Sequence, residues 1–139
     1  MDIGINAQQL RKDWESLHAI PEIGFKEYKT SAYLKERLRE MGYQVTPIAG
    51  TGLLARLDGD EPGALVGLRA DMDALQVHNE DGSTEMIHAC GHDAHCSMVL
   101  AAGELAVKRG LKKGTLYLLF QPAEETICGA SRVIKDGGL

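Results

Sequence analysis

The sequence lacks any apolar run that approaches the roughly 20 residues of a membrane-spanning helix. Its first ten residues contain neither the basic segment nor the apolar segment of a secretory signal. A basic excess is also missing: the formal net charge is -5 over 139 residues, and the lysines and arginines are scattered. Nucleic-acid binding needs such residues to be clustered. We therefore expect neither a membrane nor a nucleic acid as a partner.

Cysteine is scarce, and its spacing excludes a disulfide framework. The chain has three cysteines, Cys90, Cys96 and Cys128, which are odd in number and unevenly spaced. We expect a reducing, cytoplasmic compartment for such a chain. A cysteine beside a histidine is there more often metal-binding or catalytic than structural.

The order of apolar patterns predicts an α/β fold. Helical spacing predicts helices over residues 7–20, 30–41, 94–109 and 130–136, and strands are expected over residues 44–48, 52–57, 64–70 and 115–120. The near-continuous apolar runs at 64–70 and 115–120 predict buried strands, while Pro47 makes residues 44–48 an edge or a strand end. Residues 78–85 are polar and predict a loop. Helices that alternate with buried strands are typical of a sheet with helices on its faces.

Three clusters of polar side chains fall just after predicted buried strands, where open α/β sheets bind their ligands. In the first cluster, Asp71 and Asp73 would point to the same face if the strand continued. Neighbouring anions repel unless a cation or a hydrogen-bond donor compensates them. The pair is therefore either a solvated strand end or part of a site, as a metal ligand or as a carboxylate that orients a ligating histidine.

The second cluster spans residues 88–95 and holds three histidines, one cysteine and one aspartate. Thiolate and imidazole are ligands that zinc and similar divalent metals prefer. Gly91 would let the backbone bend so that Cys90 and His92 converge on one ion. Asp93 could instead cap the helix that we expect to begin at Ala94. Any single histidine here could be an ordinary hydrogen-bonded imidazole, but the density of ligands indicates metal binding or catalysis.

The third cluster is the pair Glu124 and Glu125, which follows the strand at residues 115–120. Next to a metal, one carboxylate can bind the ion while the other moves a proton. The alternative for this pair alone is an exposed acidic turn. Together the clusters offer a cysteine, a histidine and a glutamate as ligands and leave a coordination position for water, as in a catalytic metal site.

Four segments resemble the M20 metallopeptidase family: LHAIPEIGF at 17–25, RADMDAL at 69–75, HACGHDAH at 88–95 and FQPAEE at 120–125. The similarity is greatest to its aminoacylase/carboxypeptidase branch, which includes hippurate hydrolases and other N-acyl-amino-acid amidohydrolases. The order and spacing of the segments agree along nearly the whole chain. The resemblance implies an α/β fold, namely a zinc-peptidase-like catalytic domain with helices packed on a mixed, mostly parallel sheet.

The resemblance also implies roles for particular residues. Cys90, His92 and Glu125 match metal ligands, and Glu124 matches the general base that activates water. Asp73 matches the carboxylate that orients the site.

The resemblance to the family assigns no definite role to four further residues. Asp71 lies where other branches of the family have a ligating histidine, and the resemblance gives no role to His88 or His95. Cys128 could be a soft ligand or an idle small residue.

The implied activity is hydrolysis of the amide bond of an N-acylated amino acid or small peptide by metal-activated water. The implied cofactor is one or two divalent ions of zinc, manganese, cobalt or nickel. Residues 1–139 would form the N-terminal portion of the catalytic domain, with a lid or dimerisation domain and the C-terminal part of the catalytic domain outside this sequence. We expect self-association or a complementing C-terminal half as a partner.

Two alternatives stay open at this point. One is a non-catalytic fragment that binds a metal through Cys90, His92 and Glu125. The other is a hydrolase in which Cys90 is the nucleophile and His92 its base.

Overall fold

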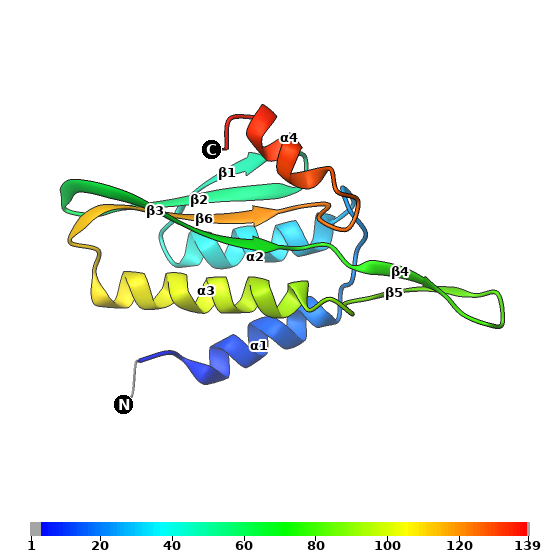
Figure 1. Ribbon diagram of the computed structural model, residues 1–139. Helices are drawn as coiled ribbons and strands as arrows, with labels where there is room; N and C mark the ends of the chain where they lie inside the picture. Colours follow the sequence, from blue (N-terminus) through cyan, green and yellow to red (C-terminus); the bar gives the residue numbers. More distant parts are fainter. Residues whose placement is uncertain (1–3, 139) are drawn as a thin grey trace.

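Residues 4–138, which the computed structural model describes, form a four-stranded sheet with helices on both faces and a two-stranded hairpin at one end (Figure 1). The elements in chain order are α1 (Ala7–His18), α2 (Tyr28–Glu40), β1 (Gln44–Ile48), β2 (Gly52–Asp58), β3 (Glu61–Asp71), β4 (Leu75–His78), β5 (Thr84–Ile87), α3 (His92–Arg109), β6 (Lys113–Gln121) and α4 (Gly129–Lys135). Helices α1, α2 and α3 lie on one side of the sheet and α4 lies on the other. The predicted α/β fold is confirmed.

The main sheet is mixed, with the strand order β1-β2-β6-β3. β1 pairs antiparallel with β2, and β2 pairs antiparallel with β6, whereas β3 and β6 are parallel. The expectation of a mostly parallel sheet is therefore wrong for residues 4–138. A short turn joins β1 to β2 and forces them to run in opposite directions, and only the connection from β3 to β6 contains a helix that reverses the chain.

The parallel pairing brings the carboxyl ends of β3 and β6 level with each other. Leu68 is opposite Leu118, and Asp71 is opposite Gln121. The turns that follow the two strands therefore begin at the same edge of the sheet. This register places the residues after Asp71 beside those after Gln121.

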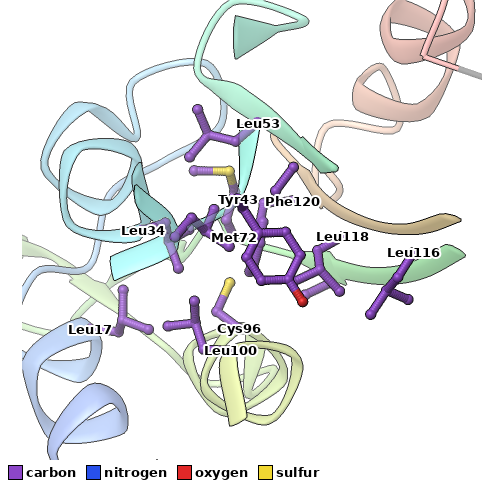
Figure 2. Close-up of a cluster of buried hydrophobic side chains, with 13 residues drawn as sticks. Leu17, Leu34, Tyr43, Leu53, Met72, Cys96, Leu100, Leu116, Leu118 and Phe120 are labelled. Carbon is purple, nitrogen blue, oxygen red and sulfur yellow. The ribbon is translucent and has the colours of Figure 1, made fainter. Parts of the chain in front are cut away.

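The main core lies between the sheet and helices α1 to α3 (Figure 2). Each helix contributes a fully buried leucine, namely Leu17, Leu34 and Leu100. They face the fully buried side chains of Leu118 and Phe120 on β6. Burial of each such side chain stabilises the fold by about 1.5–3 kcal/mol. A smaller apolar cluster on the opposite face of the sheet packs under α4.

Helix α3 begins earlier than its apolar pattern predicts. Its N-cap is Gly91, which has a left-handed backbone with φ of 80°, and Asp93 lies in the first turn. The expected start at Ala94 is therefore wrong, and the alternative in which Asp93 is the N-cap does not hold. Only glycine adopts this backbone conformation without steric cost, so Gly91 bends the chain between Cys90 and His92 as the sequence predicts.

Strand β3 differs from the expectation of a buried strand. It lies at the edge of the sheet, and the side chains of Leu65 and Val66 are 73% and 53% exposed. Only its end is buried, at Ala70 and Asp71. An apolar run indicates that the side chains of a strand need neighbouring elements to bury them. Among residues 4–138, however, no other strand pairs with the outer side of β3. β6 is confirmed as a buried central strand, and β1 is confirmed as an edge.

Most of the segment predicted as a polar loop, residues 78–85, is the turn of the β4–β5 hairpin, and only its two ends belong to the strands. Leu75 is opposite Ile87 and His78 is opposite Thr84. The hairpin projects from the body of the fold (Figure 1), so most of its side chains face water. Its strands have only four residues each, which is too short for a clear strand pattern in the sequence. Among residues 4–138, no helix has both the length and the apolar character needed to cross a membrane.

Substitution of Leu100 by alanine tests the packing of the main core. We expect Leu100→Ala to lower the free energy of unfolding by about 2–5 kcal/mol because it leaves a cavity between α3 and the sheet. The matched control is Met98→Ala on the same helix, where the side chain is 52% exposed, and there we expect a change within about 0.5 kcal/mol. Urea denaturation measures both values. Equal destabilisation by the two variants would contradict this account of the core.

Candidate metal centre

Three polar segments meet at the edge of the sheet where β3 and β6 end. The first follows β3 and contains Asp71 and Asp73. The second is residues 90–95 at the start of α3, and the third is the pair Glu124 and Glu125 after β6. The three clusters expected to form one site are therefore close together in space.

His92 lies at the middle of this group and is almost completely buried. Its Nδ1 atom is 2.8 Å from the backbone carbonyl oxygen of Asp73. A carbonyl oxygen only accepts hydrogen bonds, so Nδ1 carries the hydrogen and Nε2 is left without one in the neutral ring. The Nε2 atom faces three carboxyl groups at distances of 3.6–3.7 Å, those of Asp71, Glu124 and Glu125.

The electrostatic field around His92 favours positive charge. Burial disfavours the charged imidazole, but the hydrogen bond to Asp73 and the negative charge of Asp71 outweigh it and raise the pKa of His92 to about 9. The same field would stabilise a metal cation near Nε2. Metal binding at His92 would have to displace the proton that this field otherwise holds.

The thiol of Cys90, an imidazole nitrogen of His92 and a carboxyl oxygen of Glu125 lie within 4.8 Å of one another. The Oε1 atom of Glu125 is buried and has no hydrogen-bond partner, which is costly for a carboxyl oxygen unless a ligand satisfies it. Sulfur, imidazole nitrogen and carboxylate oxygen are the donors of zinc-type sites. These three residues therefore fit a divalent transition metal.

A second group of candidate ligands, Asp71, His92 and His95, shares His92 with the first. Asp71 accepts a hydrogen bond from His95 Nδ1 (2.7 Å) and pairs with Arg69 Nη1 (3.0 Å). Burial opposes the charge of Asp71, but the hydrogen bond from His95 and the charges of His92 and Arg69 keep its pKa below the usual value. The rings of His92 and His95 stack with their centroids 5.7 Å apart.

Asp73 holds the backbone of the glutamate pair. Its two carboxyl oxygens accept hydrogen bonds from the backbone N–H groups of Glu124 and Glu125, each at 3.0 Å. Burial opposes its charge, but the hydrogen bonds from His92 and from these two amides lower its pKa. Asp73 thus contacts both the histidine and the glutamate turn, which is the arrangement that an orienting carboxylate requires.

His88 and the two cysteines outside the predicted clusters have different surroundings. Both ring nitrogens of His88 are buried without a hydrogen-bond partner, and burial lowers its pKa. Cys96 is buried, and its thiol donates to the backbone oxygen of Asp71 (3.1 Å). Cys128 is exposed and belongs to neither group of candidate ligands within residues 4–138.

Sequence reasoning missed several residues that support the site. Arg69 donates two hydrogen bonds to Gln121 across the β3–β6 pair, at 3.0 and 2.9 Å. His18 on α1 is hydrogen-bonded to Asp93 on α3 (2.7 Å). Both His18 and Arg69 lie within the segments that carry the family resemblance, so a signal for them existed. Glu27, whose buried carboxyl group contacts the turn before Glu124, lies outside those segments and had no such signal.

Several known proteins are similar to this chain in sequence and in fold. The chain is 41% identical over 131 residues to the N-acetyl-L-cysteine deacetylase of Bacillus subtilis, a match that covers 88% of this chain and 32% of that protein. It is 40% identical over 143 residues to thermostable carboxypeptidase 2 of Saccharolobus solfataricus, a match that covers 91% of this chain and 36% of that protein. The chain spans about a third of the length of the curated relatives it matches.

A solved structure of similar fold is that of a Bacillus subtilis protein described as a dinuclear metal binding peptidase from the M20 family. It superimposes with a TM-score of 0.83 at 33% sequence identity. The match covers 95% of this chain and 39% of the chain in that structure. The model of peptidase family M20/M25/M40 matches residues 67–139, which is just over half of the chain. This match includes all the candidate metal ligands described above, and the chain belongs to peptidase family M20/M25/M40.

Proposed function

We propose that this chain supplies the N-terminal, metal-binding part of a metal-dependent amidohydrolase that cleaves the amide bond of an N-acylated amino acid or small peptide. One observation carries the proposal: the ligand atoms of Cys90, His92 and Glu125 lie within 4.8 Å of one another, with Glu124 beside them. The names of the deacetylase and carboxypeptidase relatives support this class of substrate.

Cys90, His92 and Glu125 would hold one divalent ion in this part of the chain. His92 can offer only Nε2, because its Nδ1 donates to the carbonyl oxygen of Asp73. Both groups of candidate ligands include His92, so they would compete for this one nitrogen, and one ion is proposed for the described residues. A second ion would need ligands from outside this sequence. The bound ion would polarise the substrate carbonyl and make a water molecule more acidic.

Glu124 and Glu125 differ in a way that supports different roles. The side chain of Glu125 is 23% exposed and its buried Oε1 has no hydrogen-bond partner, although His92 Nε2 lies 3.7 Å away, which suits a ligand. The side chain of Glu124 is 42% exposed, so it can reach both the site and an incoming substrate. In the proposed reaction, Glu124 accepts a proton from the attacking water and delivers it to the leaving nitrogen.

The extent of the chain is part of the same proposal. The relatives are about three times as long as the aligned segment, which supports the view that this sequence is an N-terminal portion. A lid or dimerisation domain and the rest of the catalytic domain would then lie outside it, together with the further ligands. The identity of the metal among zinc, manganese, cobalt and nickel stays a prediction.

The surroundings of Cys90 disfavour a cysteine nucleophile. A hydrogen bond with Glu125, together with the nearby carboxyl groups, raises the pKa of the Cys90 thiol. Nucleophilic cysteines need a lowered pKa. The thiol therefore fits a metal ligand better than an attacking group.

Metal analysis of the purified chain tests the proposed ligands. We expect the wild-type chain to retain a divalent ion, and we expect Cys90→Ala and His92→Ala each to weaken its binding by at least about tenfold, since even loss of an outer-shell contact costs that much. The matched control is Cys128→Ala, which removes an exposed cysteine outside the candidate groups. Equal metal retention in all four proteins would argue against this site.

Glu124→Gln tests the proposed division of roles. We expect it to reduce hydrolysis of N-acetyl and N-benzoyl amino acids by about 10²–10⁴-fold, because it removes the proton acceptor, while metal affinity stays near the wild-type value. A chelator should abolish hydrolysis, and added metal should restore it. Activity that survives the chelator but not a thiol alkylator would instead support the cysteine nucleophile. Metal binding without hydrolysis in the wild-type chain would select the non-catalytic fragment.

The exposed edge of β3 is the surface that we propose for self-association. Among residues 4–138 no strand pairs with its outer side, and the side chains of Leu65 and Val66 are exposed; such edges pair readily with other strands. We expect Leu65→Lys to shift the chain toward monomer in sedimentation velocity, since a charge on the edge opposes pairing. A wild-type chain that is monomeric at high concentration would refute this expectation.

A further inference from the structure

We infer that Glu27 is a positioning residue for the proposed metal centre, because its buried carboxyl group holds the backbone turn that presents Glu124 and Glu125. The inference rests on the proposed function, which gives those two glutamates their roles. Glu27 itself lies at the N-cap of α2 and is not one of the candidate ligands within residues 4–138.

Glu27 is fully buried, yet both of its carboxyl oxygens have partners. Oε1 accepts a hydrogen bond from the backbone N–H of Ala123 (2.8 Å), and Oε2 accepts one from the hydroxyl of Thr51 (2.5 Å). None of the ion pairs found within residues 4–138 includes Glu27. A buried carboxyl group without hydrogen-bond partners is costly, and these two donors satisfy its oxygens.

The turn that Glu27 holds has an unusual backbone. Ala123 has φ of 53°, in the left-handed region that non-glycine residues rarely adopt. Such a conformation persists only when the surrounding structure fixes it. Two buried carboxyl groups do so by accepting three successive N–H groups: Glu27 accepts that of Ala123, and Asp73 accepts those of Glu124 and Glu125.

The turn is also tightly enclosed by neighbouring backbone. A side chain at Gly24 would approach the Cα atom of Ala123 to 2.9 Å, and one at Gly129 would approach the carbonyl oxygen of Pro122 to 1.7 Å. Ala123 is itself fully buried. Removal of the Glu27 carboxyl group would therefore leave the Ala123 N–H without a partner and away from water, which is costly. The adjacent glutamates would lose their fixed orientation.

Amide hydrogen exchange, measured by NMR on the full 139-residue chain without metal, tests the hold on the turn directly. We expect Glu27→Ala to speed exchange at Ala123 and Glu124 by at least about tenfold relative to amides in α3, because a buried donor loses its acceptor. Glu27→Gln should restore slow exchange, since its amide oxygen can accept from Ala123 and its amide nitrogen can donate to Thr51.

The matched control is Asp13→Ala. Asp13 is another buried carboxyl group, but it joins α1 to α2 through Tyr33 and Arg37. We therefore expect Asp13→Ala to change global stability without a selective effect on exchange at the turn. If Glu27→Ala does not fold, Thr51→Val provides the same local test, because it removes one of the two partners of Glu27 while keeping the shape of the side chain.

Titration with Co²⁺ then connects the turn to the proposed centre. We expect Glu27→Ala to weaken Co²⁺ binding by about 10–100-fold, whereas Glu27→Gln and Asp13→Ala should stay near the wild-type affinity. The inference would be overturned by exchange at the turn of Glu27→Ala that is no faster than in Asp13→Ala. It would also be overturned if Glu27→Gln failed to restore slow exchange, or if Glu27→Ala left the Co²⁺ affinity unchanged. If the wild-type chain binds no Co²⁺, the proposed function fails, and with it the role of Glu27 at that centre, while the exchange result still shows whether Glu27 holds the turn.

Discussion

The parallel pairing of β3 with β6 is the constraint on which the arrangement of this site depends. With Asp71 opposite Gln121, both strands end at the same level, and the turns that follow them begin side by side. Arg69 adds a side-chain link to Gln121 across the same pair. A slip of one residue would move Asp71 and the glutamate turn to different levels and would reverse the faces of the side chains.

Close behind this edge, the protein keeps several acidic groups out of water and stabilises each in a different way. Asp71 relies on His95 and Arg69, Asp73 on His92 and two backbone amides, and Glu27 on one amide and one hydroxyl. Each of these contacts fixes the position of a neighbour as well as compensating the carboxyl group. Glu125 is different, because its buried Oε1 has no hydrogen-bond partner and lies 3.7 Å from His92 Nε2, so a bound cation would stabilise it.

The supporting contacts also explain how a turn with a strained backbone can hold the candidate reactive side chains in position. Asp73 connects the histidine to the glutamates, and Glu27 connects the glutamates to α2 and to the turn at Thr51. The reactive side chains are therefore held by buried groups at their backbone, which leaves the carboxyl ends of Glu124 and Glu125 free to face the site. Such an arrangement limits the reorganisation that binding or reaction would require.

Periodicity in the sequence by itself determined the α/β class, the four helices and the four strands of the main sheet, because helical and strand spacing are local properties. Ligand chemistry likewise singled out Asp71, Asp73, Cys90, His92 and the glutamate pair, and the family resemblance assigned Asp73 its orienting role. Only the tertiary structure decided that β3 is exposed, because burial depends on which strand lies next to it. It alone gave Glu27 its place, since the contacts of that residue lie 24 and 96 positions away in the chain, where no local pattern can indicate them.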